Sequence, residues 1–220
     1  MIRTDLNCDM GEGFGVFNIG NDEAIMPYIS SVNIACGFHA GDPSVMRNTV
    51  AHAINHDLLI GAHPGFADLQ GFGRREIKLS GTEIYDMVVY QIGALMAVVS
   101  AQGGKLHHVK PHGALYNMAA RDSEMAKHIA QAIFDVDDSL VLYGLSGSQL
   151  ILAGKALGLK VANEVFADRT YQSDGSLTSR SNPNSLISDH KKAINQVIKM
   201  VKEKVVVAEN GEVINIEPDT

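Results

Sequence analysis

The 220-residue chain is 45% hydrophobic and 20% charged, a balance typical of a globular protein with a real core, and its length suits a single α/β domain over residues 1–220. Its formal net charge of −7 argues against a nucleic-acid partner, because binding phosphates requires a basic surface. Two cysteines, Cys8 and Cys36, exclude a disulfide framework at this length.

The N-terminal sequence has no apolar run typical of a signal peptide. The longest apolar stretch, residues 88–101, is too short to span a bilayer and contains Gln91. We therefore expect a cytoplasmic protein without membrane contact.

Short apolar runs alternate with segments of helical period along the chain. The strands that we expect, in chain order, are residues 3–7, 32–36, 58–60, 106–109, 140–143 and 159–162. The helices between and after them begin at Asp42, at Ser80 with Glu83 as a capping box, at Asp122, and at Ser188 or Asp189. Residues 205–208 and 212–216, joined around Asn210-Gly211, read as a type I′ hairpin.

Repeated strand–helix alternation predicts parallel strands, and hence a barrel or a doubly wound sheet. Polar motifs follow nearly every predicted strand. Barrel enzymes take catalytic residues from several strand ends, whereas an open sheet concentrates them at one switch point. The sequence therefore favours an α/β barrel.

Three histidines, His39, His63 and His112, each stand just past a predicted strand with Gly or Pro beside them. Imidazole suits proton transfer near neutral pH and is also a common metal ligand. A single loop histidine is as well explained by backbone hydrogen bonds, but three in equivalent positions favour a functional site. His52 and His56 have the spacing of a helical metal pair, but they fall on the outward face of their helix.

Acidic and amide side chains approach the same edge from the first strand. Asp5, Asn7 and Asp9 alternate along it and would face inward, although Asp and Asn before glycine are also common in turns. Further along, Asp168 and Arg169 are adjacent. Arg169 could clamp a carboxylate, or the two could form a local pair that only shapes the loop.

Lys110 directly follows a predicted strand. It could be buried with a lowered pKa, act as a point charge against an oxyanion, or extend to the rim. The chain shows no phosphate-binding loop, because Gln149 stands where such a loop before Gly154-Lys155 needs glycine.

Five motifs resemble the lactam-utilisation (LamB/YcsF-like) family and cover residues 5 to about 180. They are DLNCDMGE (5–12), NIACGFHAGDP (33–43), GAHPGF (61–66), VKPHGALYN (109–117) and EVFADR (164–169). The resemblance implies a (β/α)7-type, TIM-like barrel similar to those of glycoside hydrolases and deacetylases. It also implies the A subunit of a bacterial 5-oxoprolinase, which works with subunits B and C to turn 5-oxoproline, ATP and water into glutamate, ADP and phosphate.

On this interpretation the chain is a hydrolase acting on a cyclic amide, and ATP is bound mainly by the partner subunits. The catalytic residues that we expect are Asp9, His39, His63, Lys110, His112 and Asp168. Those that we expect to bind substrate are Asp5, Asn7, Glu12, Arg169 and Tyr171. Asp9 and Asp168 are candidate bases, Lys110 a charge stabiliser and Arg169 the carboxylate anchor.

Two other interpretations stay open. One is a stand-alone, metal-dependent amidohydrolase or carbohydrate deacetylase, with a divalent ion held by the three histidines and an Asp. The other is a non-catalytic scaffold for partner subunits. Members of the family continue past the predicted hairpin into another strand, a His-Gly-Asp motif and a closing helix, whereas this sequence stops at Thr220. We therefore expect that the sequence is a shortened form or that a neighbouring chain fills the missing place; if the chain does end here, we expect a gap in the barrel wall beside the first strand.

Overall fold

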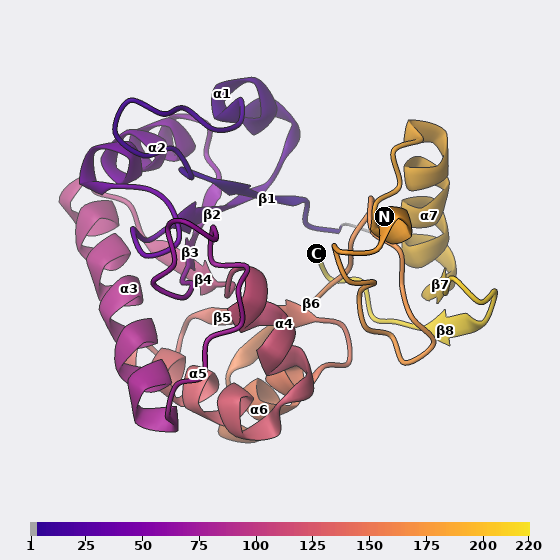
Figure 1. The fold of residues 1–220 in the computed structure, drawn as a ribbon. Coiled ribbons are helices and arrows are strands. Elements are labelled where there is room, and N and C mark those ends of the chain that lie inside the picture. Colours follow the sequence, from indigo (N-terminus) through magenta and orange to yellow (C-terminus); the bar gives the residue numbers. More distant parts are fainter. Residues whose placement is uncertain (1–3) are drawn as a thin grey trace.

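Six parallel strands form one curled sheet, in the order in which they follow one another along the chain (Figure 1). The computed structural model describes residues 4–220. The strands are β1 (Asn7–Met10), β2 (Ser31–Ala35), β3 (Leu59–His63), β4 (Leu106–Val109), β5 (Val141–Leu145) and β6 (Lys160–Glu164). Each strand pairs in parallel with the next, which confirms the α/β class predicted from strand–helix alternation.

The later strands lie where the apolar runs predicted them, but the first does not. It was expected at residues 3–7, of which residue 3 lies outside the described part of the chain, and it is found at Asn7–Met10. The reason is its pairing with β2, which places Asn7 beside Ser31 and Met10 beside Ile34. Because β1 carries polar side chains on one face, its apolar signal is weak.

Helices surround the sheet and connect successive strands. They are α2 (Pro43–Asn55), α3 (Gly81–Ala101), α4 (Gly113–Arg121), α5 (Ser123–Val136) and α6 (Gln149–Leu157), and a short α1 (Asp22–Ile25) precedes a 3-10 turn (Met26–Tyr28). The predicted start signals are confirmed: the Asp42 carboxylate accepts hydrogen bonds from the first turn of α2, and Ser80 with Glu83 forms the capping box of α3. Helices α4 and α6 were not predicted.

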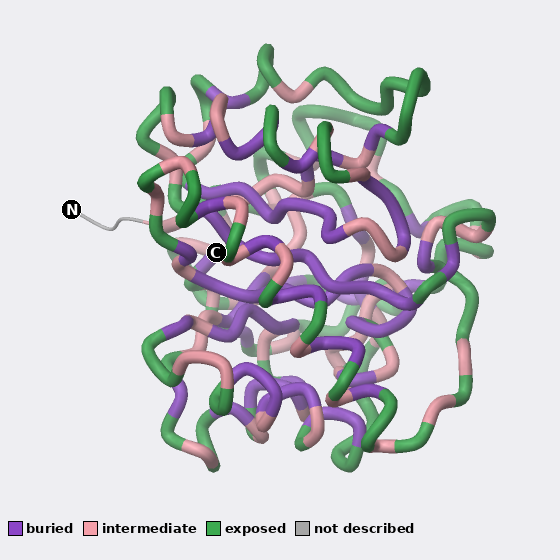
Figure 2. Tube along the Cα trace, turned by 90° about the vertical axis from the view of Figure 1, so that its left-hand side faces the viewer, coloured by how far each residue is buried: buried purple, intermediate pink, exposed green. Residues whose placement is uncertain are grey.

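The main hydrophobic core lies between the sheet and these helices. Ile34 of β2, Ile92 and Leu95 of α3 and Ile129 of α5 are fully buried there. Figure 2 shows the buried segments running through the middle of the molecule, with exposed segments at its periphery. The core thus fixes the strands from outside, which leaves their carboxyl ends free to carry polar side chains.

Helix α3 has the length and apolar composition of a membrane-crossing helix. The length of this apolar segment was therefore underestimated from the sequence, since the helix has 21 residues. One face of α3 is nevertheless packed against the protein, next to α2, α5, β3 and β4. Gln91 is buried in that face, and its side chain donates to the Gly65 carbonyl and accepts from the Gly65 N–H. In this structure α3 is a packed helix of the α/β layer.

The C-terminal part forms a second, smaller body beside the sheet, drawn in orange and yellow in Figure 1. It contains a 3-10 turn (Pro183–Ser185), α7 (His190–Glu203) and an antiparallel hairpin of β7 (Val205–Val207) and β8 (Val213–Asn215). The hairpin is confirmed, but its turn is not type I′. That turn needs positive φ at both central residues, and of Asn210 and Gly211 only Gly211 has it.

The last residues of the chain lie between the two edges of the sheet. The Asp5 N–H donates to the Asp219 carbonyl over 3.1 Å, and the Asp219 N–H donates to the Asn163 carbonyl over 2.9 Å. The Val165 N–H donates to the Thr220 carbonyl over 2.9 Å. Strands β1 and β6 are the two edges of the sheet and do not pair with each other, but this segment bridges the chain before β1 and the end of β6.

Candidate active site

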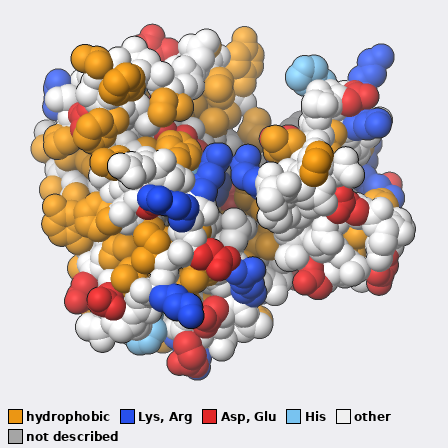
Figure 3. Space-filling model, in the orientation of Figure 1, with side chains coloured by type: hydrophobic (Ala, Val, Ile, Leu, Met, Phe, Trp, Pro, Cys, Tyr) orange, Lys and Arg blue, Asp and Glu red, His pale blue; other side chains and the backbone are white. Residues whose placement is uncertain are grey.

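A cavity of about 780 Å³ opens where the carboxyl ends of the strands meet the C-terminal part. Figure 3 shows the molecule hollowed between these two parts, with Lys and Arg side chains gathered along the hollow. The charged and imidazole side chains that line the cavity are Asp9, Glu12, His63, Arg74, Glu76, Lys110, His112, Arg121, Arg169, Asp174 and Arg180. The cavity lies at the position at which α/β barrels carry their active sites.

The three predicted histidines converge beside this cavity, and all three are buried. The rings of His39 and His112 stack with their centroids 3.7 Å apart. His63 stands edge-on to both, and its Nε2 lies 2.9 Å from His112 Nδ1. The prediction that topologically equivalent strand-end histidines meet in one site is confirmed.

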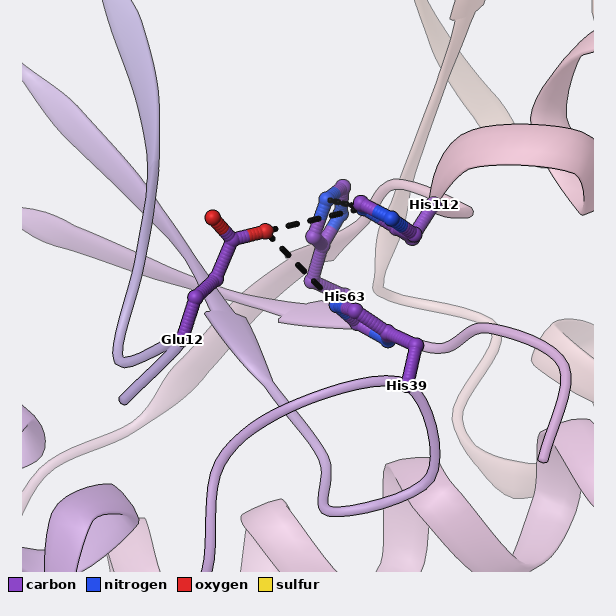
Figure 4. Close-up of side chains that lie close together, drawn as sticks. All are labelled: Glu12, His39, His63 and His112. Atoms are coloured by element: carbon purple, nitrogen blue, oxygen red, sulfur yellow. Dashed lines mark hydrogen bonds and ion pairs between the residues drawn. The ribbon is translucent and has the colours of Figure 1, made fainter. Parts of the chain in front are cut away.

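Glu12 is the fourth member of this cluster (Figure 4). Its Oε1 lies 3.7 Å from His39 Nε2 and 3.6 Å from His112 Nδ1. Burial raises the pKa of the Glu12 carboxyl. One ligand atom from each of the four residues lies within 4.8 Å of the other three, so the cluster could hold a metal ion. The sequence had suggested an aspartate in this place and had assigned Glu12 to substrate.

Two glycines make room for the stacked pair of histidines. A Cβ on Gly65 would lie 2.6 Å from His39 Nδ1, and one on Gly73 would lie 2.7 Å from His39 Cβ. Next to Gly73, Phe72 has a φ of +54°, which a bulky side chain rarely adopts. In this conformation the Phe72 carbonyl accepts a hydrogen bond of 2.8 Å from His112 Nε2. Unusual backbone is thus used to orient His112.

Burial also sets the protonation of the stacked histidines. Burial and the neighbouring His63 lower the pKa of His39 to about 3. Burial, His63 and His39 lower the pKa of His112 to about 2. Both rings are therefore neutral near pH 7, where their free nitrogens can accept a hydrogen bond or coordinate a cation.

Lys110 joins the histidine cluster to a second network. Its ammonium group lies 2.6 Å from Glu164 Oε1 and 3.0 Å from Asp9 Oδ1, and Asp9 Oδ2 lies 3.3 Å from His63 Nε2. Burial acts to lower the pKa of Lys110, but Asp9 and Glu164 outweigh it and raise the pKa above its ordinary value. Of the three options open for this lysine, the buried point charge is thus supported, and the lowered pKa and the rim position are wrong.

Asp9 is correspondingly held ionised. Burial acts to raise its pKa, but His63 and Lys110 hold it well below the ordinary value. Glu164, which ends β6 and is almost fully buried, was missed by sequence reasoning. Its position directly at a strand end was the available signal.

Asp5, Asn7 and Asp9 do face inward, as the alternation predicted, but only Asp9 reaches the cavity. Asn7 lies one layer below, where its Oδ1 accepts from Lys110 over 3.1 Å. Asp5 lies lower still and accepts hydrogen bonds from Ser31, Tyr143 and Thr220. The expectation that Asp5 and Asn7 bind substrate is not supported by these positions, because their polar atoms are used inside the sheet.

The segment after β6 also differs from expectation. Arg169 is buried, and its guanidinium group donates to the carbonyls of Ser185 and Thr178, so it holds the loop. Asp168 is exposed and does not join the cluster. Tyr171 is buried in a second hydrophobic cluster, and its hydroxyl accepts from the Phe166 N–H over 2.7 Å. Adjacency to a strand end did not reveal which way these side chains point.

Two arginines that the sequence did not single out lie on the cavity rim. Arg74 and Arg180 both line the cavity and are both exposed. Partial desolvation in the cavity and the like charge of Arg180 lower the pKa of Arg74 below its ordinary value. Paired cations of this kind favour an anionic ligand group between them.

Residues set aside on sequence grounds lie away from the cavity lining. His52 pairs with Glu23 on the outer face of α2, and His56 follows the end of that helix and is exposed. Burial raises the pKa of the Cys8 thiol to about 11 and that of Cys36 to about 12. The raised pKa values keep both thiols protonated near neutral pH, where a thiol is a weak nucleophile.

Comparison with known proteins agrees with this geometry. The LamB/YcsF family model matches residues 4–220. The chain is 63% identical over 220 residues to a protein of Shouchella clausii that is named as the A subunit of 5-oxoprolinase, covering 100% of this chain and 87% of that protein. It is 61% identical to the protein of the same name from Tolumonas auensis, covering 100% of this chain and 88% of the relative.

A solved structure gives the same result. The crystal structure of the lactam utilization protein from Thermus thermophilus matches with a TM-score of 0.95 and 46% sequence identity, covering 100% of this chain and 89% of that one. The chain therefore belongs to the LamB/YcsF family.

Proposed function

We propose that the protein is the A subunit of a 5-oxoprolinase, a hydrolase that opens a cyclic amide as part of a multi-subunit complex. One observation carries this proposal. Eight relatives that are 56–63% identical over 98–100% of the chain are all named as the A subunit of 5-oxoprolinase. The cavity supports it, because it combines cations, carboxylates and neutral imidazoles around a space large enough for an amino-acid-sized substrate.

The substrate is 5-oxoproline, a five-membered lactam that carries one carboxylate. In our proposal this carboxylate lies against Arg74 and Arg180, which take the role that the sequence gave to Arg169. The lactam oxygen then points toward Lys110, whose fixed positive charge stabilises the negative charge of the phosphoryl group that this oxygen receives. Asp9, held ionised between Lys110 and His63, keeps both groups in place.

Proton transfer falls to the imidazoles. We assign it to His63, which lines the cavity and lies between Asp9 and His112, because the low pKa values of His112, His39 and Asp9 make all three weak bases near neutral pH. Tyr116 is buried in the cavity wall, and burial together with Glu164 raises its pKa well above the ordinary value. Its phenol therefore keeps its proton and can donate a hydrogen bond to the substrate.

ATP enters through the partner subunits. We propose that subunits B and C bind ATP and direct phosphorylation of the lactam oxygen, which makes the ring carbon more electrophilic. One water then adds to this carbon, the C–N bond breaks and the nitrogen takes up a proton, and a second water hydrolyses the resulting acyl phosphate, so that 5-oxoproline, ATP and two waters become glutamate, ADP and phosphate. We place this work in the cytoplasm, where ATP is supplied and where thiols such as Cys8 and Cys36 stay reduced.

We also propose that the curled sheet is the wall of a (β/α)7-type barrel similar to those of glycoside hydrolases and deacetylases. Asp219 and Thr220 support this, because their backbone groups bond to the chain on both sides of the gap between β6 and β1. This is the place that a seventh strand would take. A barrel closed there would have no free sheet edge.

Reconstitution tests the function. The purified chain alone, and the chain with subunits B and C, are each given 5-oxoproline and ATP, and glutamate and phosphate are measured. We expect glutamate only from the complete mixture, and we expect Arg74→Gln to raise the KM for 5-oxoproline at least tenfold. Arg47→Gln, a change of the same chemistry on α2, is the matched control. ATP-dependent turnover by the isolated chain would contradict the division of labour.

The histidine cluster favours one second candidate, a metal-dependent amidohydrolase that acts alone. The same experiment separates the two, because that enzyme would open amides without ATP and without partners. A non-catalytic scaffold would behave differently again: the complex would keep its turnover after Lys110→Met, provided that the three subunits still assemble.

A further inference from the structure

Four side chains from four different strand ends meet at one point beside the cavity (Figure 4). Glu12 comes from the loop after β1, His39 from the loop after β2, His63 from the end of β3, and His112 from the loop after β4. We propose that Glu12, His39, His63 and His112 bind one divalent metal ion of the zinc class.

The first argument is the direction of the ring nitrogens. His63 Nδ1 lies 2.7 Å from the Lys110 carbonyl, and His112 Nε2 lies 2.8 Å from the Phe72 carbonyl. A carbonyl only accepts, so each of these nitrogens carries the ring proton. In a neutral ring the other nitrogen then presents a lone pair. Metal-binding histidines are oriented by this same kind of bond to a backbone carbonyl.

The two remaining nitrogens, His63 Nε2 and His112 Nδ1, face each other over 2.9 Å. Two lone pairs at this distance repel unless something positive lies beside them. Either a proton on His63 Nε2, which Asp9 Oδ2 at 3.3 Å would stabilise, or a cation between the rings removes the repulsion. The neighbouring side chains distinguish these two cases.

His39 favours the cation. The ring is 1% exposed, and neither of its nitrogens has a hydrogen-bond partner among residues 4–220. An unpaired buried polar group costs about 1–3 kcal/mol. A proton between His63 and His112 would leave both His39 nitrogens unpaired. An ion in the cluster pairs His39 Nε2 and relieves His63 and His112 at the same time.

The separations are those of a coordination shell. Ligand atoms about 2.1 Å from a zinc-class ion lie about 3.0–3.4 Å from one another. The separations found are 2.9 Å for His63–His112, 3.6 Å for His112–Glu12 and 3.7 Å for His39–Glu12. The Glu12 contacts are too long for hydrogen bonds. All four atoms lie within 4.8 Å of one another, and the stacked rings of His39 and His112 must turn toward the ion for both to bind it. Three imidazoles and one carboxylate suit zinc and cobalt rather than magnesium or calcium.

The charges of the site point the same way. Asp9, Glu12 and Glu164 each carry −1 when ionised, and Lys110 carries +1. The sum is −2 in a largely buried region, which one divalent ion neutralises. Placed at the cavity wall, the ion would polarise the lactam carbonyl or its water. That role rests on the proposed function, whereas the binding itself does not.

The test is metal binding by the purified full chain, measured without substrate. The protein is dialysed against a chelator, freed of it, and titrated with Zn²⁺ or Co²⁺. Bound metal is counted by mass spectrometry after gel filtration, and the Co²⁺ ligands are observed in the visible spectrum. We expect one ion per chain, at least tenfold weaker binding in Glu12→Gln, and loss of stoichiometric binding in His39→Asn. His52→Asn, which changes an outer-face histidine, is the matched control and keeps full binding.

Circular dichroism of each variant separates lost binding from lost folding. If His39→Asn unfolds, the thermal shift of the wild-type protein on adding Zn²⁺ decides the matter, with a rise of several degrees expected. Wild-type protein that binds no more metal than His39→Asn, or that shows no thermal shift, overturns the inference. Stoichiometric binding without 5-oxoproline turnover in the reconstituted complex would leave the metal site standing and refute the proposed function.

Discussion

The pairing of Lys110 predicts a large loss of stability when its charge is removed. In Lys110→Met the side chain keeps much of its volume, but Glu164 and Asp9 lose their cation. The Lys110 and Glu164 side chains are 6% and 2% exposed, whereas the Asp9 side chain is 37% exposed. Solvent can therefore stabilise the charge of Asp9. Most of the loss in folding free energy comes from the unpaired charge of Glu164.

Breaking a buried pair by removing one partner costs about 3–5 kcal/mol. Since only one of the two carboxylates is fully buried, we take the lower end, about 3 kcal/mol. For a chain of this size that corresponds to a fall in Tm of about 6–12 °C. Equilibrium urea unfolding, followed by circular dichroism, measures the free energy directly.

Two further variants isolate the cause. Lys127→Met removes one side of an exposed ion pair with Glu124 and should change stability by less than about 1 kcal/mol. The double change Lys110→Met with Glu164→Gln removes the stranded charge as well, and it should recover at least half of the loss. A loss below about 1 kcal/mol in Lys110→Met, or no recovery in the double variant, would refute the view that an uncompensated buried charge is the cause.

Three other predictions follow from single contacts. The hydrogen-bonded ion pair with Arg75 lowers the pKa of Asp68 to about 2. The stabilising effect of this pair is therefore present above about pH 4 and is lost as the pH falls toward 2. In acid unfolding experiments, Asp68→Asn should flatten this part of the curve of stability against pH. Gly65→Ala should displace His39, whose Nδ1 would lie 2.6 Å from the new Cβ, and lower the turnover of the reconstituted complex at least tenfold, while Gly93→Ala, which meets nothing within 4 Å, should leave it unchanged. Cys36, with a pKa raised to about 12 by burial, should stay unreactive toward a thiol reagent at pH 7 until the protein is unfolded, and rapid labelling of the native protein would contradict the structure.

Sequence reasoning found the three histidines because strand ends in a parallel sheet share one edge, so equivalent positions must converge. It could not assign the partner of Lys110, since Asp9 lies 101 residues away in the chain and no local pattern encodes that contact. Glu12 was expected to bind substrate, and it does line the cavity, but no pattern predicted its place beside His39 and His112. Its direction depends on the loop after β1, where Gly11 has a φ of +68°, and a glycine motif predicts a turn but not where the next side chain points.

The segment after β6 shows the opposite error. Asp168 and Arg169 are charged residues that follow a strand end, as site residues often do. The guanidinium group of Arg169, however, donates its hydrogen bonds to buried backbone carbonyls. The chemistry of a side chain indicates a role only when its partners are not already supplied by the fold. Arg74 and Arg180 carry the same charge, remain exposed at the cavity, and gave no local signal.

Asp9 explains why the charged network and the histidine cluster must be considered as one site. Its Oδ1 accepts from Lys110, and its Oδ2 faces His63, so a single carboxylate lies between a fixed cation and the cluster where a metal ion would sit. Without Asp9, the positive charges of Lys110 and of the metal ion would repel each other. Strand β1, which carries Asp9, is paired to β2 through four consecutive positions. A rigid carboxylate between two positive centres leaves both facing the same cavity. In a lactam hydrolase this arrangement would place two electrophilic groups on the carbonyl oxygen while keeping them apart, and an amide needs such help because its carbonyl is a poor electrophile.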